Sequence, residues 1–278
     1  MKLTRFLAIG TLLAGVLAPA LAQAAGNVTV KGSDTMVILG QRWAEEYMKK
    51  NPGTAIQVTG GGSGTGISAL INGTTDICQS SRSIKPAERE KLRDRYATTG
   101  VEIPVAKDGL SVYVNESNPL TELTMEQVRQ IFTGKVTNWK DLGGPEGKII
   151  AYSRENSSGT YVFFKEHVLQ NADFTPRAQN MPGTAAVVNA VGREKFSIGY
   201  GGAAYSKGIK VLKIKKDAGS PAIAPNKATV QDGTYALARP LFFYLRNKPS
   251  GDIKSFVDWT LSAEGQAIVD KVGYFPIK

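Results

Sequence analysis

The sequence has little of the side-chain chemistry on which metal centres, disulfides and general-base catalysis depend. Its 278 residues include one histidine and one cysteine. A single cysteine cannot form an intrachain disulfide, and a transition-metal site needs several His or Cys ligands. We therefore expect no metal site, no cofactor and no enzymatic activity. Cys78, in the segment TDICQS, is predicted to be a buried small hydrophobe, and His167 a partly exposed surface residue.

Long apolar runs are also missing after the first 25 residues. No later segment approaches about 18 consecutive apolar residues, the length of a membrane-spanning helix. The N-terminus, MKLTR followed by FLAIGTLLAGVLAPALA and a small-x-small site, is typical of a secretory leader. Residues 1–25 are predicted to be a signal peptide cleaved near Ala24, and the mature chain to be periplasmic. No cysteine stands directly after the apolar run, so a lipoprotein leader is not expected.

Acidic residues are fewer than basic ones, and the net charge is +10. A basic surplus suits an anionic partner, because it raises the local concentration of anions at the surface. The lysines and arginines are scattered singly along the chain, unlike the basic stripe of a nucleic-acid-binding face. The charge therefore indicates a small anion as partner, or a solvated surface, and not a nucleic acid.

Short β-branched segments alternate with amphipathic helical patterns, which predicts an α/β architecture. Residues 213–229 contain two prolines and a glycine and are predicted to be an irregular loop. A capping-box pattern, Thr124 with Gln127, marks the start of one short helix, and Gly134 follows its end. Helices are expected at residues 36–50, 64–72, 86–96, 124–132, 159–169 and 263–271.

Three turns rich in Ser, Thr and Gly each follow or flank a strand signal and open a helix signal. They are GSDT at 32–35, GGGSGTG at 60–66 and RENSSGT at 154–160. The first N–H groups of a helix have no intrahelical partner, and the helix dipole is positive there. Several such helix N-termini that converge on one point could hold a tetrahedral oxyanion. Simple helix capping by Ser, Thr and Asp is the alternative interpretation of each turn.

The glycine-rich turn is the hardest to explain by capping. Five glycines in seven residues carry an entropic cost that needs a reason, such as close approach of a ligand to the backbone. Arg82 and Arg154 stand beside such turns, and a guanidinium can donate two N–H groups to one anion. The alternative for either arginine is an ion pair with Glu88 or Glu155.

Catalytic motifs are not satisfied. GGGSGTG has a threonine two residues after Ser63, so it does not match the nucleophile motif G-x-S-x-G, and it lacks the G-K-[ST] ending of a Walker A loop. An exported phosphatase with Ser63 or Ser158 as nucleophile remains an alternative, but no base or metal ligand accompanies either serine. A scaffold protein that kept the fold and lost its ligand is a further alternative.

The chain resembles the periplasmic phosphate-binding proteins of Pst-type ABC importers over nearly all of its predicted mature length. The resemblance rests on motifs in this order: KGSDTM, GGGSGTGISALINGTTDICQSSR, VAKDGLSVYVN, IFTGKVTNWKDLGG, SRENSSGTYVFF and SIGYGGAAY. It implies high-affinity binding of inorganic phosphate and delivery to the membrane permease of the importer. A monomer is expected.

The resemblance also implies a type II venus-flytrap fold, with two α/β lobes, two crossover hinge strands and the anion in the cleft between the lobes. Lobe 1 would hold residues 26–108 and 205–278, and lobe 2 residues 109–204. The hinges would lie at 107–110 and 198–204. The residues that it places at the phosphate are Thr35, Met36, Ser63, Ser81, Arg82, Arg154, Ser158, Gly159 and Thr160. Ser33 and Asp34, from the same turn as Thr35, are predicted to bind phosphate with them.

The chain departs from the family pattern at Ser81. Some family members have an aspartate there, whose carboxylate accepts the proton of hydrogen phosphate. The nearest carboxylate in a site turn is Asp34, which would favour a protonated anion and repel sulfate. If Asp34 instead caps its helix, this explanation of phosphate selectivity is lost. A receptor for sulfate, molybdate or phosphonate is therefore the leading alternative function.

Overall fold

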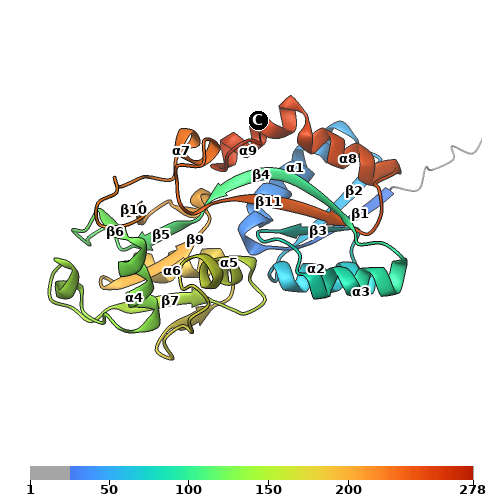
Figure 1. The fold of residues 1–278 in the computed structure, drawn as a ribbon. Helices are drawn as coiled ribbons and strands as arrows, with labels where there is room; N and C mark the ends of the chain where they lie inside the picture. The colour runs from blue at the N-terminus through green and yellow to red at the C-terminus, as the bar shows by residue number, and fades with distance from the viewer. Residues whose placement is uncertain (1–25, 278) are drawn as a thin grey trace, which may run out of the picture.

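Two β-sheets, each with its own helices and apolar core, form the two lobes of the protein (Figure 1). The computed structural model describes residues 26–277, so the predicted signal peptide lies outside the described residues. Lobe 1 combines residues 26–109 with residues 238–277, and lobe 2 consists of residues 110–237. The architecture is α/β, as the sequence predicts.

Lobe 1 is built around a five-stranded sheet. Its elements are β1 (Gly26–Gly32), η1 (Asp34–Met36), α1 (Val37–Lys50), β2 (Thr54–Thr59), α2 (Ser63–Asn72), β3 (Ile77–Ser80), α3 (Pro86–Tyr96), β4 (Val101–Gly109), β11 (Ala238–Leu245), α8 (Gly251–Leu261) and α9 (Ala263–Val272). The strand order is β2-β1-β3-β11-β4. β1 pairs in parallel with β2 and β3, whereas β11 is antiparallel to both of its neighbours.

Trp43 ties three elements of lobe 1 together. It lies on α1 and is fully buried. Its ring packs edge-on against Phe243 of β11, with ring centroids 5.6 Å apart. Its indole N–H donates to the carbonyl of Gly265 in α9, with an N–O distance of 2.8 Å. The helix predicted at residues 36–50 therefore packs its apolar face into the core of lobe 1.

Lobe 2 is built around a six-stranded sheet. Its elements are β5 (Ser111–Val114), β6 (Glu122–Thr124), α4 (Met125–Thr133), η2 (Trp139–Leu142), β7 (Ile150–Arg154), α5 (Gly159–His167), β8 (Gln179–Met181), α6 (Thr184–Arg193), β9 (Ser197–Gly201), η3 (Ala203–Tyr205), β10 (Lys210–Lys215) and α7 (Lys227–Gln231). The strand order is β6-β10-β5-β9-β7-β8. Phe132, Phe164 and Tyr200 pack against one another in its core.

The chain crosses between the lobes twice, along β4 and β11, which pair with each other over their full length. The first crossing lies at 109–110, between β4 and β5. The second lies at 237–238, and not at the predicted 198–204. Residues 205–237 belong to lobe 2, because β10 lies between β6 and β5 and because Tyr235 and Leu237 join the core of this lobe. The predicted assignment of 205–237 to lobe 1 is therefore wrong.

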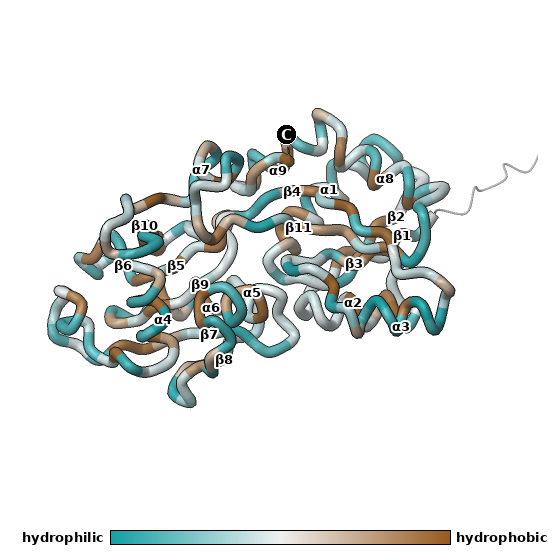
Figure 2. Tube along the Cα trace, in the orientation of Figure 1, coloured by the Kyte–Doolittle hydropathy of each residue, from teal (hydrophilic) through white to brown (hydrophobic). Residues whose placement is uncertain are grey.

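Local signals give the ends of several helices correctly. α3 has the predicted bounds, and Figure 2 shows it as hydrophilic over most of its length. Thr124 and Gln127 form the predicted capping box of α4, and Gly134 ends that helix in the left-handed conformation. The loop predicted at 213–229 is only partly irregular, since its first residues belong to β10 and its last to α7.

The remaining sequence predictions concern single residues and the membrane. Cys78 is fully buried, and burial raises the pKa of its thiol far above the usual value. His167 is exposed, and its ring stacks on Phe163 at 4.0 Å between centroids. Among residues 26–277, no helix has the length and apolarity that a membrane span requires.

Candidate anion-binding site

The turn from β1 into η1 brings two hydroxyl groups to the boundary between the lobes. Gly32 is required there: its φ is +146°, and a Cβ at this position would lie 2.1 Å from the carbonyl oxygen of Gln79. The hydroxyl of Ser33 donates to Ser81 Oγ at 2.8 Å, and Thr35 Oγ1 lies 2.8 Å from Thr160 Oγ1 of lobe 2. All four hydroxyl-bearing residues are buried.

The glycine-rich turn between β2 and α2 packs against the backbone of lobe 2. Gly62 has a φ of +91°, and a Cβ on it would lie 2.6 Å from the carbonyl oxygen of Ser157. The N–H of Gly64 donates to the same carbonyl at 2.8 Å. Close approach therefore explains these glycines, but the approaching group is the backbone of the other lobe. Ser63, the first residue of α2, accepts a hydrogen bond from the N–H of Ser81 at 3.1 Å.

The turn between β7 and α5 presents a helix N-terminus to these hydroxyls. Ser158 caps α5 by accepting from the N–H of Tyr161 at 3.2 Å. A Cβ added to Gly159 would lie 2.3 Å from Ser63 Oγ and 2.8 Å from Ser81 Oγ, so α5 points its first turn at lobe 1. Within the described part of the chain, the N–H groups of Gly159 and Thr160 donate no hydrogen bond.

Arg154 ends β7 with its guanidinium buried between the lobes, at 1% side-chain exposure. Its Nη2 donates to Asp34 Oδ2 at 2.9 Å and to Glu155 Oε1 at 2.7 Å, its Nε to Glu155 Oε2 at 3.2 Å, and its Nη1 to Thr184 Oγ1 at 2.9 Å. A guanidinium has five N–H donors. Four of them are used in these bonds, which leaves one on Nη1.

Arg154 determines the ionisation of the Glu155 carboxylate. Its partial burial raises its pKa, but the hydrogen bond and the positive charge of Arg154 outweigh burial and leave the pKa below the usual value. Glu155 therefore stays ionised in the cleft. It also accepts from the N–H of Gly183 at 3.4 Å, which fixes the start of α6 beside the site.

Asp34 does not cap its helix. Its Oδ1 accepts from the N–H of Gly61 at 2.9 Å, and its Oδ2 accepts from Arg154 of lobe 2. The backbone carbonyl of Asp34 also accepts from the hydroxyl of Tyr205 of lobe 2 at 2.7 Å. Burial raises the pKa of Tyr205 to about 12, so this phenol remains a donor. Asp34 is thus a contact point between the lobes, which are closed on one another.

Two predicted donors are engaged elsewhere. The N–H of Met36 donates to the carbonyl of Ser33 at 3.0 Å, within the turn itself. Arg82 pairs through both terminal nitrogens with Glu88, at 2.8 Å and 2.7 Å. Arg82 therefore forms the ion pair with Glu88 that was the alternative interpretation, while its buried Nε has no hydrogen-bond partner among the described residues.

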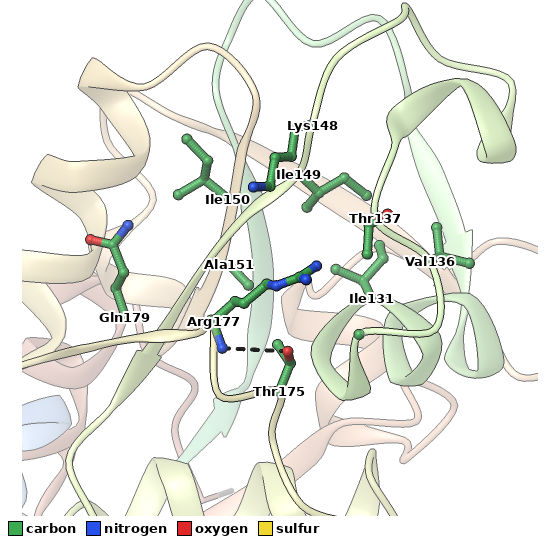
Figure 3. Close-up of a pocket in the computed structure, with 11 residues that line it drawn as sticks. Ile131, Val136, Thr137, Lys148, Ile149, Ile150, Ala151, Thr175, Arg177 and Gln179 are labelled. Atoms are coloured by element: carbon green, nitrogen blue, oxygen red, sulfur yellow. Dashed lines mark hydrogen bonds between the residues drawn. The ribbon is translucent and has the colours of Figure 1, made fainter.

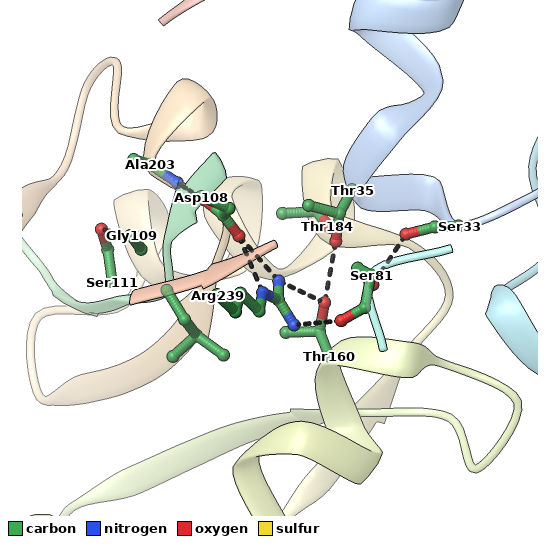
Figure 4. Close-up of polar contacts among 12 residues, drawn as sticks. Ser33, Thr35, Ser81, Asp108, Gly109, Ser111, Thr160, Thr184, Ala203 and Arg239 are labelled. Carbon is green, nitrogen blue, oxygen red and sulfur yellow. Dashed lines mark hydrogen bonds and ion pairs between the residues drawn. The ribbon is translucent and has the colours of Figure 1, made fainter. Parts of the chain in front are cut away.

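Three residues that the sequence analysis missed belong to the same region. Thr184 begins α6 and binds Arg154. Arg239 of β11 donates to Thr160 Oγ1 at 3.0 Å and pairs with Asp108 of β4 (Figure 4). In the three predicted turns, small polar residues before a helix signal indicated the start of a helix. The segment PGT before an apolar run could have indicated the helix start at Thr184 in the same way. No local pattern marks Arg239 or Asp108.

One cavity, of about 400 Å³, reaches the cluster of buried hydroxyls, because its lining includes Ser81, Arg82 and Arg239. Another cavity, of about 260 Å³ in lobe 2, is lined by residues that include Ile131, Ala151, Lys148 and Arg177, and the side chain of Arg177 extends towards Ile131 (Figure 3). None of the predicted anion-binding residues lines it. Residues 26–277 contain no group of His, Cys, Asp or Glu side chains arranged to hold a metal ion. The hydroxyl cluster is therefore the candidate site.

Two lobes joined by two strands, with buried hydrogen-bond donors from both lobes between them, define a two-lobed α/β binding protein. Residues 18–264 match the model of the PBP superfamily domain. The chain is 35% identical to the phosphate-binding protein PstS of Pseudomonas aeruginosa, in an alignment that covers 100% of this chain and 96% of the relative. It is also 35% identical to PstS of Staphylococcus haemolyticus, over 90% of this chain and 80% of that one. The chain belongs to the PstS family of phosphate-binding proteins.

A solved structure agrees with this assignment. It is that of a Clostridium perfringens protein described as a phosphate ABC transporter substrate-binding protein, and it contains bound phosphate. It is 29% identical to this chain and superposes with a TM-score of 0.83 over 91% of this chain and all of that one.

Proposed function

We propose that this protein binds inorganic phosphate between its lobes and delivers it to the membrane permease of an ABC importer. One observation carries the proposal: the N-termini of α2 and α5, which come from different lobes, meet around the buried hydroxyls of Ser63, Ser81 and Thr160. Helix N-termini attract anions through their free N–H groups and their dipoles. The names of the PstS relatives support phosphate as the anion.

The anion would be held mainly by neutral donors. The free N–H groups of Gly159 and Thr160, the hydroxyls around them and the remaining N–H of Arg154 are the donors at hand. Arg154 itself faces two carboxylates, those of Asp34 and Glu155, so it adds no net positive charge to the cleft. Closure about the crossings at 109–110 and 237–238 would replace water around the anion with these fixed donors.

The proposed setting is the periplasm. The N-terminal residues resemble a cleavable leader, and the receptor is proposed to act as a monomer that carries phosphate to its permease, without a cofactor and without catalysis. A monomer suits this role because each molecule must open and close around one anion.

Calorimetric titration of the mature protein with inorganic phosphate tests the function. We expect one site per chain, and at least about tenfold weaker binding in Arg154→Ala, because a hydrogen bond to a charged group contributes about 1.5 to 3 kcal/mol. Arg177→Ala, at an exposed arginine of lobe 2 outside the cleft, is the matched control and should bind as the wild type does. Unchanged affinity in Arg154→Ala would remove this arginine from the site.

A receptor for another tetrahedral oxyanion is the second candidate function, and the hydrogen bonds of Asp34 favour it. Both carboxylate oxygens of Asp34 already accept hydrogen bonds, and Ser81 has a hydroxyl that can donate as well as accept. Titrations with phosphate and sulfate at about pH 6 and pH 8 separate the candidates. Binding of sulfate as tight as that of phosphate, at both pH values, would support the broader receptor.

The exported phosphatase receives no support from the geometry. Ser158 Oγ caps α5, and Ser63 Oγ accepts from the N–H of Ser81. Within the described residues, neither hydroxyl contacts a histidine or a carboxylate that could act as general base. Turnover of a chromogenic phosphate ester that disappears in Ser63→Ala would reverse this conclusion.

A further inference from the structure

A buried ion pair joins the two strands that cross between the lobes. Arg239 of β11 and Asp108 of β4 are directly opposite each other in the strand register. Nε and Nη2 of Arg239 donate to Asp108 Oδ2 at 3.0 Å and 2.8 Å, and the two side chains are 1% and 0% exposed. A buried pair of this kind often adds little net stability, because both charges lose their hydration. Its other contacts therefore indicate what it does.

The remaining bonds of the pair reach both lobes. Nη1 of Arg239 donates to the carbonyl of Ser81 in lobe 1 at 3.1 Å, and Nη2 donates to Thr160 Oγ1 in lobe 2 at 3.0 Å. Asp108 Oδ1 accepts from the N–H of Ala203 in lobe 2 at 3.0 Å. Figure 4 shows Arg239 between Asp108 on one side and, on the other, the hydroxyl of Thr160 and the carbonyl of Ser81.

The bond from Arg239 to Thr160 limits how the hydroxyls of the candidate site can pair. A guanidinium can only donate, and a threonine hydroxyl has one proton. Thr160 Oγ1 accepts from Arg239 and lies 2.8 Å from Thr35 Oγ1. If Thr35 donates to Thr160, the proton of Thr160 is free for the anion; if Thr160 donates to Thr35, the proton of Thr35 is free. In either case the hydroxyl pair offers the anion a donor, and the positive charge behind it strengthens that donor.

We propose that Arg239, held in place by Asp108, is a positioning residue of the anion site that orients the Thr160–Thr35 hydroxyl pair as a donor. Arg239 acts through Thr160 and does not itself contact the anion. This role rests on the proposed phosphate-binding function. It also places a ligand-orienting group on a crossing strand, so that lobe closure and alignment of the hydroxyls occur together.

A double-mutant cycle tests whether Arg239 acts through Thr160. The pair is made neutral by Asp108→Asn with Arg239→Gln, which avoids leaving one buried charge without its partner. Phosphate affinity is measured by calorimetry for the wild type, the neutral pair, Thr160→Val and the combination. We expect the neutral pair to lose about tenfold in affinity in the wild-type background, equivalent to one charged hydrogen bond. In the Thr160→Val background the neutral pair should weaken phosphate affinity by less than about twofold, because the hydroxyl that Arg239 orients is absent from this background.

Two controls keep the outcomes distinct. Arg89→Gln with Glu102→Gln removes an ion pair of lobe 1 that contacts none of the site hydroxyls, and it should leave affinity within about twofold. If the neutral pair does not fold, Arg239→Lys takes its place. Lysine keeps the positive charge beside Asp108 but cannot donate to Asp108, Ser81 and Thr160 at once as the planar guanidinium does. This variant should weaken phosphate binding about threefold or more, and only when Thr160 is present.

The results separate the positioning role from the function on which it rests. Equal losses with and without the Thr160 hydroxyl would overturn the positioning role while phosphate binding stands. A wild-type protein that does not bind phosphate would overturn the proposed function itself, and the positioning role with it.

Discussion

Gly159→Ala should block closure of the lobes without damaging either lobe. The Cβ of the alanine would lie 2.3 Å from Ser63 Oγ, 2.8 Å from Ser81 Oγ and 2.9 Å from Ser63 Cβ, all in lobe 1. Overpacking of this kind costs about 1 to 3 kcal/mol. The cost falls on the closed form alone, because opening the cleft moves α5 away from these atoms. At about 1.4 kcal/mol per tenfold, phosphate affinity should fall roughly fivefold to 150-fold.

The stability of Gly159→Ala should not fall in parallel. Gly159 is the first residue of α5 and has no positive φ, and alanine is a better helix former than glycine. We therefore expect a thermal unfolding midpoint without phosphate at or above that of the wild type, measured by circular dichroism, together with the calorimetric loss of affinity.

Gly192→Ala is the matched control for this substitution. Gly192 also lies in a helix of lobe 2, and a Cβ there would be 3.6 Å from the nearest atom, which is ordinary van der Waals contact. It should bind phosphate as the wild type does. If Gly159→Ala also binds normally, the first turn of α5 does not approach Ser63 and Ser81 in the bound form, and the reasoning about closure fails.

Two further predictions concern lobe 1, one at the partly buried Glu88 and one at the fully buried Cys78. Burial raises the pKa of Glu88, but hydrogen bonds from Arg82 and from the N–H of Lys85 leave it below the usual value. The stabilisation is therefore complete above about pH 4.3, the value in the unfolded chain, and is lost as the pH falls through the lower folded value. Glu88→Gln should lower the free energy of unfolding by about 3 kcal/mol at neutral pH, as measured by urea unfolding. Below pH 5 the free energy of unfolding of the variant should decrease less steeply with falling pH than that of the wild type. If the two free energies instead decrease in parallel, the prediction is wrong. The thiol of Cys78 should not react with an aromatic disulfide reagent in the folded protein and should react fully in urea, and rapid reaction in the native state would show that the α2–β3 packing opens.

The parts of the fold that the sequence predicts are those with local causes. The capping box at Thr124 and the proline at the start of α3 act within one helical turn, so the sequence shows them directly. The Ser/Thr/Gly turns are also visible in the local sequence, because each opens a helix. The structure brings Ser63, Ser81 and Thr160 together from three of the predicted segments.

The parts that the sequence does not predict depend on distant partners. The alternating segment of β10 fits either sheet equally well, and only its pairing with β5 and β6 decides that it belongs to lobe 2. Arg239 resembles any arginine in a strand until Asp108, distant in sequence, is placed opposite it. The role of Asp34 was open for the same reason, since its partner Arg154 lies on the other lobe.

The placement of β11 has a consequence for the order in which the chain can fold. β11 lies inside the sheet of lobe 1, between β3 and β4, although it comes after all of lobe 2 in the sequence. Lobe 2 is one continuous segment and has every strand of its sheet once residue 237 has been made. In a chain that emerges N-terminus first, the early strands of lobe 1 must wait for residues 238–245 with the edge of β3 unpaired. The first lobe to begin is therefore the last to be completed, and a C-terminal truncation before β11 would remove an interior strand of lobe 1.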